Sequence, residues 1–341
     1  MRRWQIWLGL AVSAVFLAWA LRGLRLESVW QAARRAELAW LIPGVAAYFI
    51  AVWARAWRWR YLLHPLGEVS TRAAFPLVAI GYMGNNLYPA RLGELLRAYV
   101  LRRRTGIAVS GSLATIVVER ALDGVVMLGF VFLNLPELAR AAGQRAEAGA
   151  GLVEQVYPLA LLGAIAFLGA TAAFLALAIF PRPAARLLEW FSGILPERVR
   201  PRARALGERF LAGLGSLRSP VAAPMLLLTS ALIWLLETGK YWFVMHAFPF
   251  RVSFFVLMLM NGIVNLATTI PSAPGYLGTF DAPGVAVLTA AGVPADVAAA
   301  YTLVLHAALW LPITALGAYY LARESVSVRQ IRRELAESPA P

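Results

Sequence analysis

Six stretches of the chain are long and apolar enough to cross a membrane, and this feature restricts the fold more than any other. They lie at 4–21, 38–57, 109–135, 153–180, 221–248 and 297–321. A helix needs about 20 apolar residues to span the hydrocarbon core of a bilayer. Because 60% of the residues are hydrophobic and 15% are charged, a soluble core cannot absorb them all. The sequence predicts an all-α polytopic membrane protein with about six transmembrane helices.

Two further apolar segments, 73–100 and 253–290, are interrupted near their middle by residues that break helices. The expected breakers are Pro89 and Gly93 in the first segment, and Pro271, Pro274, Gly275 and Gly278 in the second. Interrupted backbone is tolerated at membrane depth only where protein or a water-filled cavity satisfies its polar groups. We therefore expect two re-entrant broken-helix hairpins, each of which enters and leaves the membrane on the same side.

The order of span, span, hairpin and span occurs twice, once in 1–135 and once in 153–321. Because three crossings separate the two copies, the second runs in the opposite direction. Inverted repeats with broken helices in corresponding positions point to a transporter with its site at the repeat interface. We expect a single transmembrane domain over 1–324, followed by a short cytoplasmic tail at 325–341.

Basic residues are concentrated between the apolar segments, which predicts the orientation of the chain. The net charge is +14, and Lys240 is the one lysine among 32 basic residues. Segments placed inside hold most of the arginines, including Arg55, Arg58 and Arg97, so both termini are expected to be cytoplasmic. The same rule accounts for the charge without a nucleic-acid partner and predicts a bacterial cytoplasmic membrane protein. The run 4–21 is expected to be a membrane anchor rather than a cleaved signal peptide.

Residues 181–219 form the longest connection, rich in arginine and interrupted by proline. One interpretation is a pair of amphipathic helices on anionic headgroups. The other is a solvated cytoplasmic loop.

Several kinds of chemistry lack the residues that they need. The chain has no cysteine, and its three histidines are far apart in sequence, so neither a metal site nor a cofactor is expected. Patterns for acyl hydrolysis and for nucleotide phosphate binding are missing. Transport is therefore expected rather than catalysis.

Charged side chains in the middle of the span 109–135 are the first candidates for a function. Glu119 and Asp123 share a helix face, and Arg120 lies within ion-pair reach of Asp123. Ionisable groups inside a bilayer are functional candidates by default. These three either face a polar pathway or form a buried ion-pair network that only holds helices together.

Polar groups also gather at the break of the first hairpin. The candidates for headgroup contact there are Asn85, Asn86, Tyr88, Arg91, Glu94 and Arg97. A guanidinium can bind a phosphate through two parallel hydrogen bonds, so Arg91 is the first choice for a phosphate ligand. The alternative is a ladder of ion pairs in which Glu94 neutralises Arg91 and Arg97.

The second half of the chain supplies mostly neutral hydrogen-bonding groups. Its candidates for the pathway are Asn265, Thr269, Ser272 and Asp281, with the expected intramembrane pair of Glu237 and Lys240. Such a lining suits a polar headgroup or water, although turn-forming residues would give the same pattern. His306, midway along the last span, is either a proton-relay residue or the partner in a hydrogen bond between helices.

These motifs occur in one order along the chain. The helix end Arg55-x2-Arg58-Trp59-Arg60 comes first, then the run from Gly81 to Arg97, the Glu119-Arg120-x2-Asp123 cluster, and Asn265 followed by Pro271-x2-Pro274-Gly275-x2-Gly278. Together they resemble the lysylphosphatidylglycerol synthase transmembrane family, also called flippase-like, which is the membrane half of the multiple peptide resistance factor. One departure is Tyr276, which stands where such proteins often have glycine.

The resemblance implies movement of lipid rather than its synthesis, because 341 residues leave no room for the soluble aminoacyl-transfer domain. We predict a lipid translocase that moves a phospholipid, aminoacylated phospholipid or glycolipid headgroup, with anionic headgroups preferred. The alternatives are a membrane-embedded lipid-modifying transferase and a non-catalytic scaffold for a partner enzyme. A homo-oligomer or a complex with a lipid-synthesis enzyme is also left open.

Overall fold

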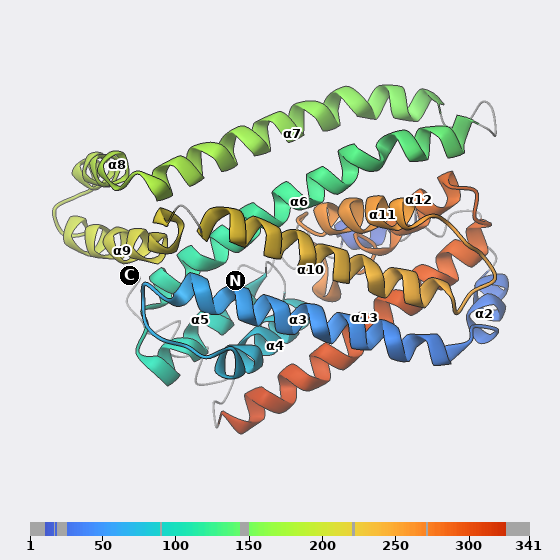
Figure 1. The fold of residues 1–341 in the computed structure, drawn as a ribbon, viewed down its shortest axis with the longest axis horizontal. Helices are drawn as coiled ribbons and strands as arrows, with labels where there is room; N and C mark the ends of the chain where they lie inside the picture. Colours follow the sequence, from blue (N-terminus) through green and yellow to red (C-terminus); the bar gives the residue numbers. More distant parts are fainter. Residues whose placement is uncertain are drawn as a thin grey trace.

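The computed structural model describes residues 11–16, 18, 26–88, 91–143, 150–219, 222–270 and 272–324, with the backbone alone for 135–143 and 150–164 (Figure 1). The predicted breakers Pro89 and Pro271, the predicted tail 325–341 and most of the predicted span 4–21 lie outside these residues. Within the described ranges the secondary structure is helical and contains no strand. The chain is therefore an all-α protein, as predicted.

The first repeat half contains α2 (Leu26–Arg34), η1 (Leu38–Trp40), α3 (Leu41–Leu63), α4 (Thr71–Leu87), α5 (Leu92–Thr105) and α6 (Val109–Gly143). The second repeat half contains α7 (Ala150–Ile179), α8 (Pro181–Ile194), α9 (Arg200–Gly213), η2 (Gly215–Arg218), α10 (Ala222–Met245), α11 (Phe254–Ala267), η3 (Pro274–Tyr276), α12 (Asp281–Ala290) and α13 (Ala295–Arg323).

Three described helical segments are long and apolar enough to cross a membrane: Leu38–Leu63, Ala222–Met245 and Ala295–Arg323. They confirm the expected helices at 38–57, 221–248 and 297–321. The last part of α7 qualifies together with α8, and the two helices meet at an angle of 102°. The predicted span 109–135 lies within one continuous helix, α6, and contains the charged residues Glu119, Arg120 and Asp123. The chain is a multi-pass membrane protein.

Helices α4 and α5 form an antiparallel hairpin whose two arms touch through glycine. A Cβ atom on Gly84 would lie 2.6 Å from the Cα of Gly93, and one on Gly93 would overlap the carbonyl oxygen of Gly81. The hairpin therefore depends on the absence of side chains at these positions. The chain reverses between Leu87 and Leu92, where the sequence predicts a break.

Helices α11 and α12 pack against each other and form the second hairpin. Each hairpin begins with a serine cap: Ser70 Oγ accepts from the N–H of Ala73, and Ser253 Oγ accepts from the N–H of Val256. The second break is longer than the first, and Gly275 and Gly278 have φ angles of 78° and 81° within it. Both predicted breaks are therefore present in the helices.

The two halves pack in a reciprocal manner. Helix α3 packs against α10, while α4 packs against α13 and α11 packs against α6. In chain order α3 to α6 correspond to α10 to α13, so the second and third contacts are the same contact with the halves exchanged. Figure 1 shows α3 and α10 side by side through the middle of the molecule, with α13 running obliquely to them.

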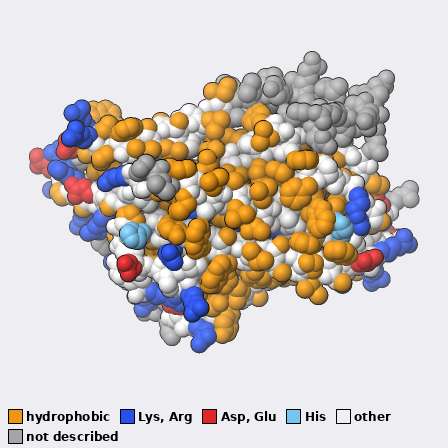
Figure 2. All heavy atoms as spheres, viewed as in Figure 1, with side chains coloured by type: hydrophobic (Ala, Val, Ile, Leu, Met, Phe, Trp, Pro, Cys, Tyr) orange, Lys and Arg blue, Asp and Glu red, His pale blue; other side chains and the backbone are white. Residues whose placement is uncertain are grey.

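Helices α8 and α9 lie together at one end of the molecule (Figure 1). On the face drawn in Figure 2, hydrophobic side chains cover the middle, and lysine and arginine side chains gather toward the two ends. A wide apolar belt between charged ends is the surface expected of a helical membrane protein. On α8, Trp190, Phe191 and Ile194 are exposed.

Candidate functional site

Five charged side chains from α3, α5 and α6 form a buried ion network. Arg58 Nη1 lies 2.7 Å from Asp123 Oδ1, and Arg55 Nη1 lies 3.0 Å from Asp123 Oδ2. Glu119 lies 3.5 Å from Arg58 and 2.5 Å from Arg97. Each of the five is at least nine-tenths buried. Because an isolated buried charge is strongly destabilising, these residues fix the relative positions of the three helices.

Two aromatic rings complete the surroundings of these arginines. The guanidinium of Arg97 lies 4.1 Å from the ring centroid of Trp59, and that of Arg55 lies 4.9 Å from that of Trp234. Cation–π contacts of this kind gain strength when water is excluded. They allow the arginines to remain charged inside the helix bundle.

Arg55 connects the network to α10. Its Nη2 lies 3.4 Å from Glu237 Oε1, and the other oxygen of Glu237 pairs with Lys240. The Lys240 ammonium also lies 4.4 Å from the ring centroid of Tyr48. The predicted Glu237–Lys240 pair is therefore confirmed, and it is buried.

The break of the first hairpin presents Arg91 and sits beside Arg120. Arg91 adopts a left-handed conformation with φ 54° directly before α5, which is uncommon for a residue other than glycine. Its Nη2 donates over 3.5 Å to the carbonyl oxygen of Thr268 in the second break. Arg120 pairs instead with Glu94 at 3.1 Å and with Asp123 at 3.7 Å. Within the described residues, no carboxylate pairs with Arg91.

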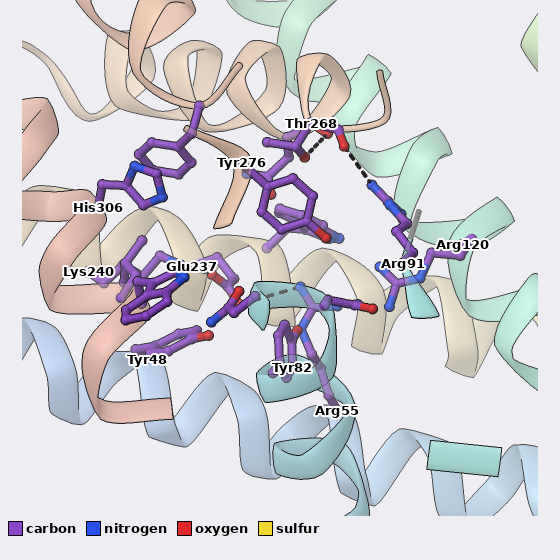
Figure 3. A pocket seen from close by; sticks show the side chains of 17 residues that line it. Tyr48, Arg55, Tyr82, Arg91, Arg120, Glu237, Lys240, Thr268, Tyr276 and His306 are labelled. Atoms are coloured by element: carbon purple, nitrogen blue, oxygen red, sulfur yellow. Dashed lines mark hydrogen bonds and ion pairs between the residues drawn. The ribbon is translucent and has the colours of Figure 1, made fainter. Parts of the chain in front are cut away.

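A cavity of about 130 Å³ lies where the two breaks meet the central helices (Figure 3). It is large enough to hold several water molecules. Its wall is formed by Tyr48, Arg55, Tyr82, Asn85, Asn86, Arg91, Arg120, Trp234, Glu237, Lys240, Asn265, Thr268, Tyr276, Phe280, His306, Leu309 and Trp310. Side chains 262 positions apart in the sequence thus share one polar space, as the inverted-repeat hypothesis expects of a site.

The cavity wall is positively charged. It contains four cationic side chains, Arg55, Arg91, Arg120 and Lys240, and among the described wall residues one carboxylate, Glu237. In Figure 3 Arg91 and Arg120 lie together on one side and Lys240 lies on the opposite side, with Tyr276 between them. The buried Nε1 of Trp234 has no hydrogen-bond partner. A wall with excess positive charge and unused donors favours an anionic ligand.

The second break brings a histidine into this wall. His306 Nδ1 lies 2.8 Å from Asp281 Oδ1, and its Nε2 lies 2.8 Å from the carbonyl oxygen of Gly275. Asp281 Oδ2 accepts from the N–H of Gly278 at 2.9 Å. Tyr276, between Gly275 and Gly278, has φ 60°, a left-handed conformation that strains the backbone of a residue other than glycine.

Only some of the site residues predicted from the sequence lie at the cavity wall. The cavity wall includes seven of its residues: Asn85, Asn86, Arg91, Arg120, Glu237, Lys240 and Asn265. Among the described residues the others lie off the wall: Tyr88, Glu94, Arg97, Glu119, Asp123, Thr269, Ser272 and Asp281. Glu119 and Asp123 lie in the ion network, Ser272 bonds to Thr279, and Thr269 is exposed.

One interpretation of the arginines is wrong. The proposed ladder of Arg91, Glu94 and Arg97 does not form, because Glu94 pairs with Arg120 and Arg97 pairs with Glu119. Arg55, Arg58 and Arg97, which were expected in cytoplasmic segments, are buried in ion pairs, and their side of the membrane stays a prediction. In each of these pairs the partner comes from another helix.

Sequence reasoning missed the aromatic part of the wall. Tyr48, Tyr82, Trp234, Phe280 and Trp310 line the cavity, and none of them was singled out as a site residue. Tryptophan in membrane proteins is mostly an interfacial anchor, so its presence alone does not indicate a site. One available signal was position, because Trp234 and Trp310 lie in the middle of their apolar stretches.

Long apolar helices around a buried ion network and a cationic cavity define a membrane protein with a polar site in its interior. Residues 6–317 match the family described as the lysylphosphatidylglycerol synthase TM region. The chain belongs to this family, as its motifs predict.

Two curated relatives cover most of the chain without a named activity. Both are called UPF0104 membrane protein and come from Methanothermobacter thermautotrophicus. One is 27% identical, covering 84% of this chain and 86% of the relative, and the other is 24% identical, covering 82% and 83%. A third relative, glycosyltransferase AglD of Haloferax volcanii, is 25% identical over 87% of this chain but only 53% of its own length. No solved structure gives a significant match.

Proposed function

We propose that the chain translocates lipids with an anionic, phosphate-bearing headgroup across the cytoplasmic membrane. The observation that carries this proposal is the cationic cavity between the two broken hairpins, in which Arg91 has no carboxylate partner among the described residues. The main barrier to lipid movement is the removal of a charged headgroup from water. A hydrated cavity with a free guanidinium lowers that barrier while the acyl chains remain in lipid.

Arg91 is proposed as the phosphate ligand because of its position and its unused donors. Among the described residues its one hydrogen bond is a long one of 3.5 Å, to a backbone carbonyl, so a phosphate oxygen can replace that acceptor. Arg120 and Lys240 already have carboxylate partners. They contribute a positive potential, whereas Arg91 can bind the headgroup directly.

The membrane arrangement proposed here has six crossings and two re-entrant hairpins, related as inverted repeats. The reciprocal packing of α4 on α13 and of α11 on α6 supports it, as do the serine caps that begin α4 and α11. We propose that the arginine-rich end with α8 and α9 faces the cytoplasm, with both termini. A bacterial-type cytoplasmic membrane fits this distribution.

Glu119 and Asp123 are proposed to support the site rather than to contact lipid. Their carboxylates are occupied by Arg55, Arg58 and Arg97, and neither lines the cavity. The network they form places Arg55 at the cavity wall and holds α3 against α6. Of the two roles that the sequence allows, a polar pathway or a buried ion-pair network that holds helices together, we propose the ion-pair network for these two carboxylates.

The test is lipid movement in liposomes that contain the purified protein and a fluorescent phosphatidylglycerol. Arg91→Asn is the informative variant, because asparagine tolerates the left-handed backbone at this position and removes only the guanidinium. We expect wild-type protein to move the labelled lipid and Arg91→Asn to lower the rate at least about tenfold, equivalent to one lost charge-assisted hydrogen bond. The matched control is Arg102→Gln, which removes an exposed guanidinium from the same helix.

The proposal is wrong if wild-type liposomes move no labelled lipid faster than empty ones, with phosphatidylglycerol, phosphatidylethanolamine and a glycolipid all tested. Equal rates for Arg91→Asn and wild type would remove Arg91 from the site.

A lipid-modifying transferase is the second candidate, because one relative is named a glycosyltransferase. A transferase would need a general base, and the carboxylates suited to that role by position, Glu94 and Asp123, are both held in ion pairs with arginine. Headgroup turnover in the presence of a sugar or aminoacyl donor would favour the transferase over transport.

A further inference from the structure

Both ring nitrogens of His306 are engaged in short contacts inside the protein. Nδ1 lies 2.8 Å from a carboxylate oxygen of Asp281 and Nε2 lies 2.8 Å from the carbonyl oxygen of Gly275. His306 and Asp281 are more than nine-tenths buried. The imidazole also packs on the ring of Phe280, with centroids 4.4 Å apart.

These contacts determine how many protons the pair holds. A carbonyl oxygen can only accept, so Nε2 of His306 must carry a hydrogen. Nδ1 and the Asp281 oxygen at 2.8 Å then need a second proton between them, on the ring or on the carboxyl group. In either case the pair has two protons and no net charge.

Loss of the second proton would disrupt the contacts and leave the pair with a charge of −1. If the remaining proton stays on Nε2, the lone pair of Nδ1 faces the carboxylate. If it moves to Nδ1, the lone pair of Nε2 faces the carbonyl oxygen of Gly275. One of the two contacts becomes repulsive in both tautomers.

The hydrogen bonds of His306 and Asp281 hold the second break in place. His306 on α13 bonds to Gly275, and Asp281 also accepts from the N–H of Gly278. Both glycines have positive φ angles. The protonated pair therefore holds the break against α12 and α13 through these hydrogen bonds. In the deprotonated pair one of the hydrogen bonds is lost.

His306 belongs to the cavity wall, so the charge of the pair acts on whatever the cavity holds (Figure 3). The other ionisable groups of that wall are Tyr48 and Arg55 on α3, Tyr82 on α4, Arg91 before α5, Arg120 on α6, Glu237 and Lys240 on α10, and Tyr276 in η3. When the cavity is empty, the excess positive charge favours the deprotonated pair. An anion cancels that charge and repels the deprotonated pair, so it favours the protonated one.

We propose that His306 and Asp281 form a proton-binding site that couples lipid translocation to proton movement. This inference rests on the proposed function and names its second substrate: a proton binds together with the anionic headgroup and leaves when the headgroup leaves. By linkage, each ligand tightens the binding of the other by the same factor. A proton gradient would then drive the lipid in the direction of proton flow.

Asp281→Asn is the decisive variant. Its amide oxygen can accept from the N–H of Gly278 and its amide nitrogen can donate to Nδ1 of His306, so both contacts of the neutral imidazole are kept without the second proton. The variant imitates the protonated pair at every pH. The matched control is Asp296→Asn, which removes the same charge at the start of α13, away from the cavity wall.

The first measurement is the ¹⁵N spectrum of histidine-labelled protein purified without a histidine tag, which contains three imidazoles. We expect the Nδ1 signal of His306 to change with pH in wild type and in Asp296→Asn, because the shared proton is lost as the pH rises. In Asp281→Asn His306 stays a neutral ring with its hydrogen on Nε2. Wild-type and Asp281→Asn spectra with the same pH dependence would overturn the shared proton.

The second measurement is binding of short-chain phosphatidylglycerol to the detergent-solubilised protein. We expect wild type and Asp296→Asn to bind about tenfold more tightly at pH 5 than at pH 8, and Asp281→Asn to bind tightly at both. A pH-independent affinity in wild type, or no binding at any pH, would overturn the coupling. A histidine that only links helices would leave the affinity insensitive to pH.

These two measurements need no lipid movement, so they separate the two proposals. If wild-type liposomes move no lipid but the spectra and the affinities behave as expected, the proposed function fails and the proton site stands. If liposomes move lipid at a rate unaffected by a pH gradient, and the affinity is also insensitive to pH, the proton coupling fails and the proposed function stands.

Discussion

Arg58 and Asp123 form a fully buried ion pair with a nitrogen–oxygen distance of 2.7 Å, joining α3 to α6 across 65 positions of the sequence. Arg58 also donates to Ser230 on α10, so one guanidinium on α3 contacts side chains from two other helices. Because Arg58 lies at the centre of the ion network, we expect its replacement to destabilise the protein more than that of any other residue in the network.

Replacing Arg58 with methionine is expected to lower the stability of the detergent-solubilised protein by about 3–5 kcal/mol, because Asp123 and Glu119 lose a buried counterion. The measurement is thermal unfolding followed by circular dichroism. Arg60→Met is the control, since Arg60 is exposed two positions further along α3, and it should change little. The double variant Arg58→Met, Asp123→Leu should recover part of the loss; an additive loss would contradict a pairwise role.

The ion network shows how far one sequence can be interpreted. Glu119, Arg120 and Asp123 were recognised because charge within an apolar stretch is costly. Arg55 and Arg58, the partners of Asp123, were not recognised, because they resemble the charged end of a helix predicted to stop at residue 57. Helix α3 continues to Leu63, which keeps both arginines inside the bundle. Ion pairs between residues more than 60 positions apart cannot be predicted from the spacing of residues in one sequence.

The hairpins were easier to predict than the cavity. Proline and glycine interrupt helices for local reasons, so the breaks near Arg91 and Gly275 could be expected from the sequence. Which side chains then meet depends on packing between halves of the chain. Tyr48 and Trp310 share the cavity wall from opposite ends of the sequence, and no local pattern brings them together.

Gly93→Ala is expected to separate the arms of the first hairpin. The added methyl group would overlap backbone atoms of Gly81 and Asn85, and backbone cannot move aside as a flexible side chain can. We expect a loss of at least about 2 kcal/mol in unfolding free energy. Gly129→Ala on α6 is the matched control, because a Cβ there has nothing within 4 Å and alanine favours the helix. Equal stability for the two variants would mean that the arms are further apart than the structure places them.

Helix α8 is expected to lie in the membrane interface, with Trp190 and Phe191 among the acyl chains. The chain has no cysteine, so a single introduced cysteine can carry an environment-sensitive fluorophore. We expect a fluorophore at Trp190→Cys to emit at shorter wavelength in anionic liposomes than one at Glu197→Cys, which lies in the exposed turn after α8. Emission at the same wavelength would favour the solvated-loop interpretation of residues 181–219.

The same cysteine-free background tests the orientation of the chain. If the arginine-rich end is cytoplasmic, a cysteine at Glu197 should be protected from a membrane-impermeant maleimide in intact cells and labelled only after the membrane is opened. A cysteine at Arg251, in the connection between α10 and α11, should be labelled in intact cells. The reason is that α10 separates these positions and is long enough to cross the bilayer. Equal labelling of both cysteines in intact cells would show that α10 does not cross, and the inverted relation between the two hairpins would then be wrong.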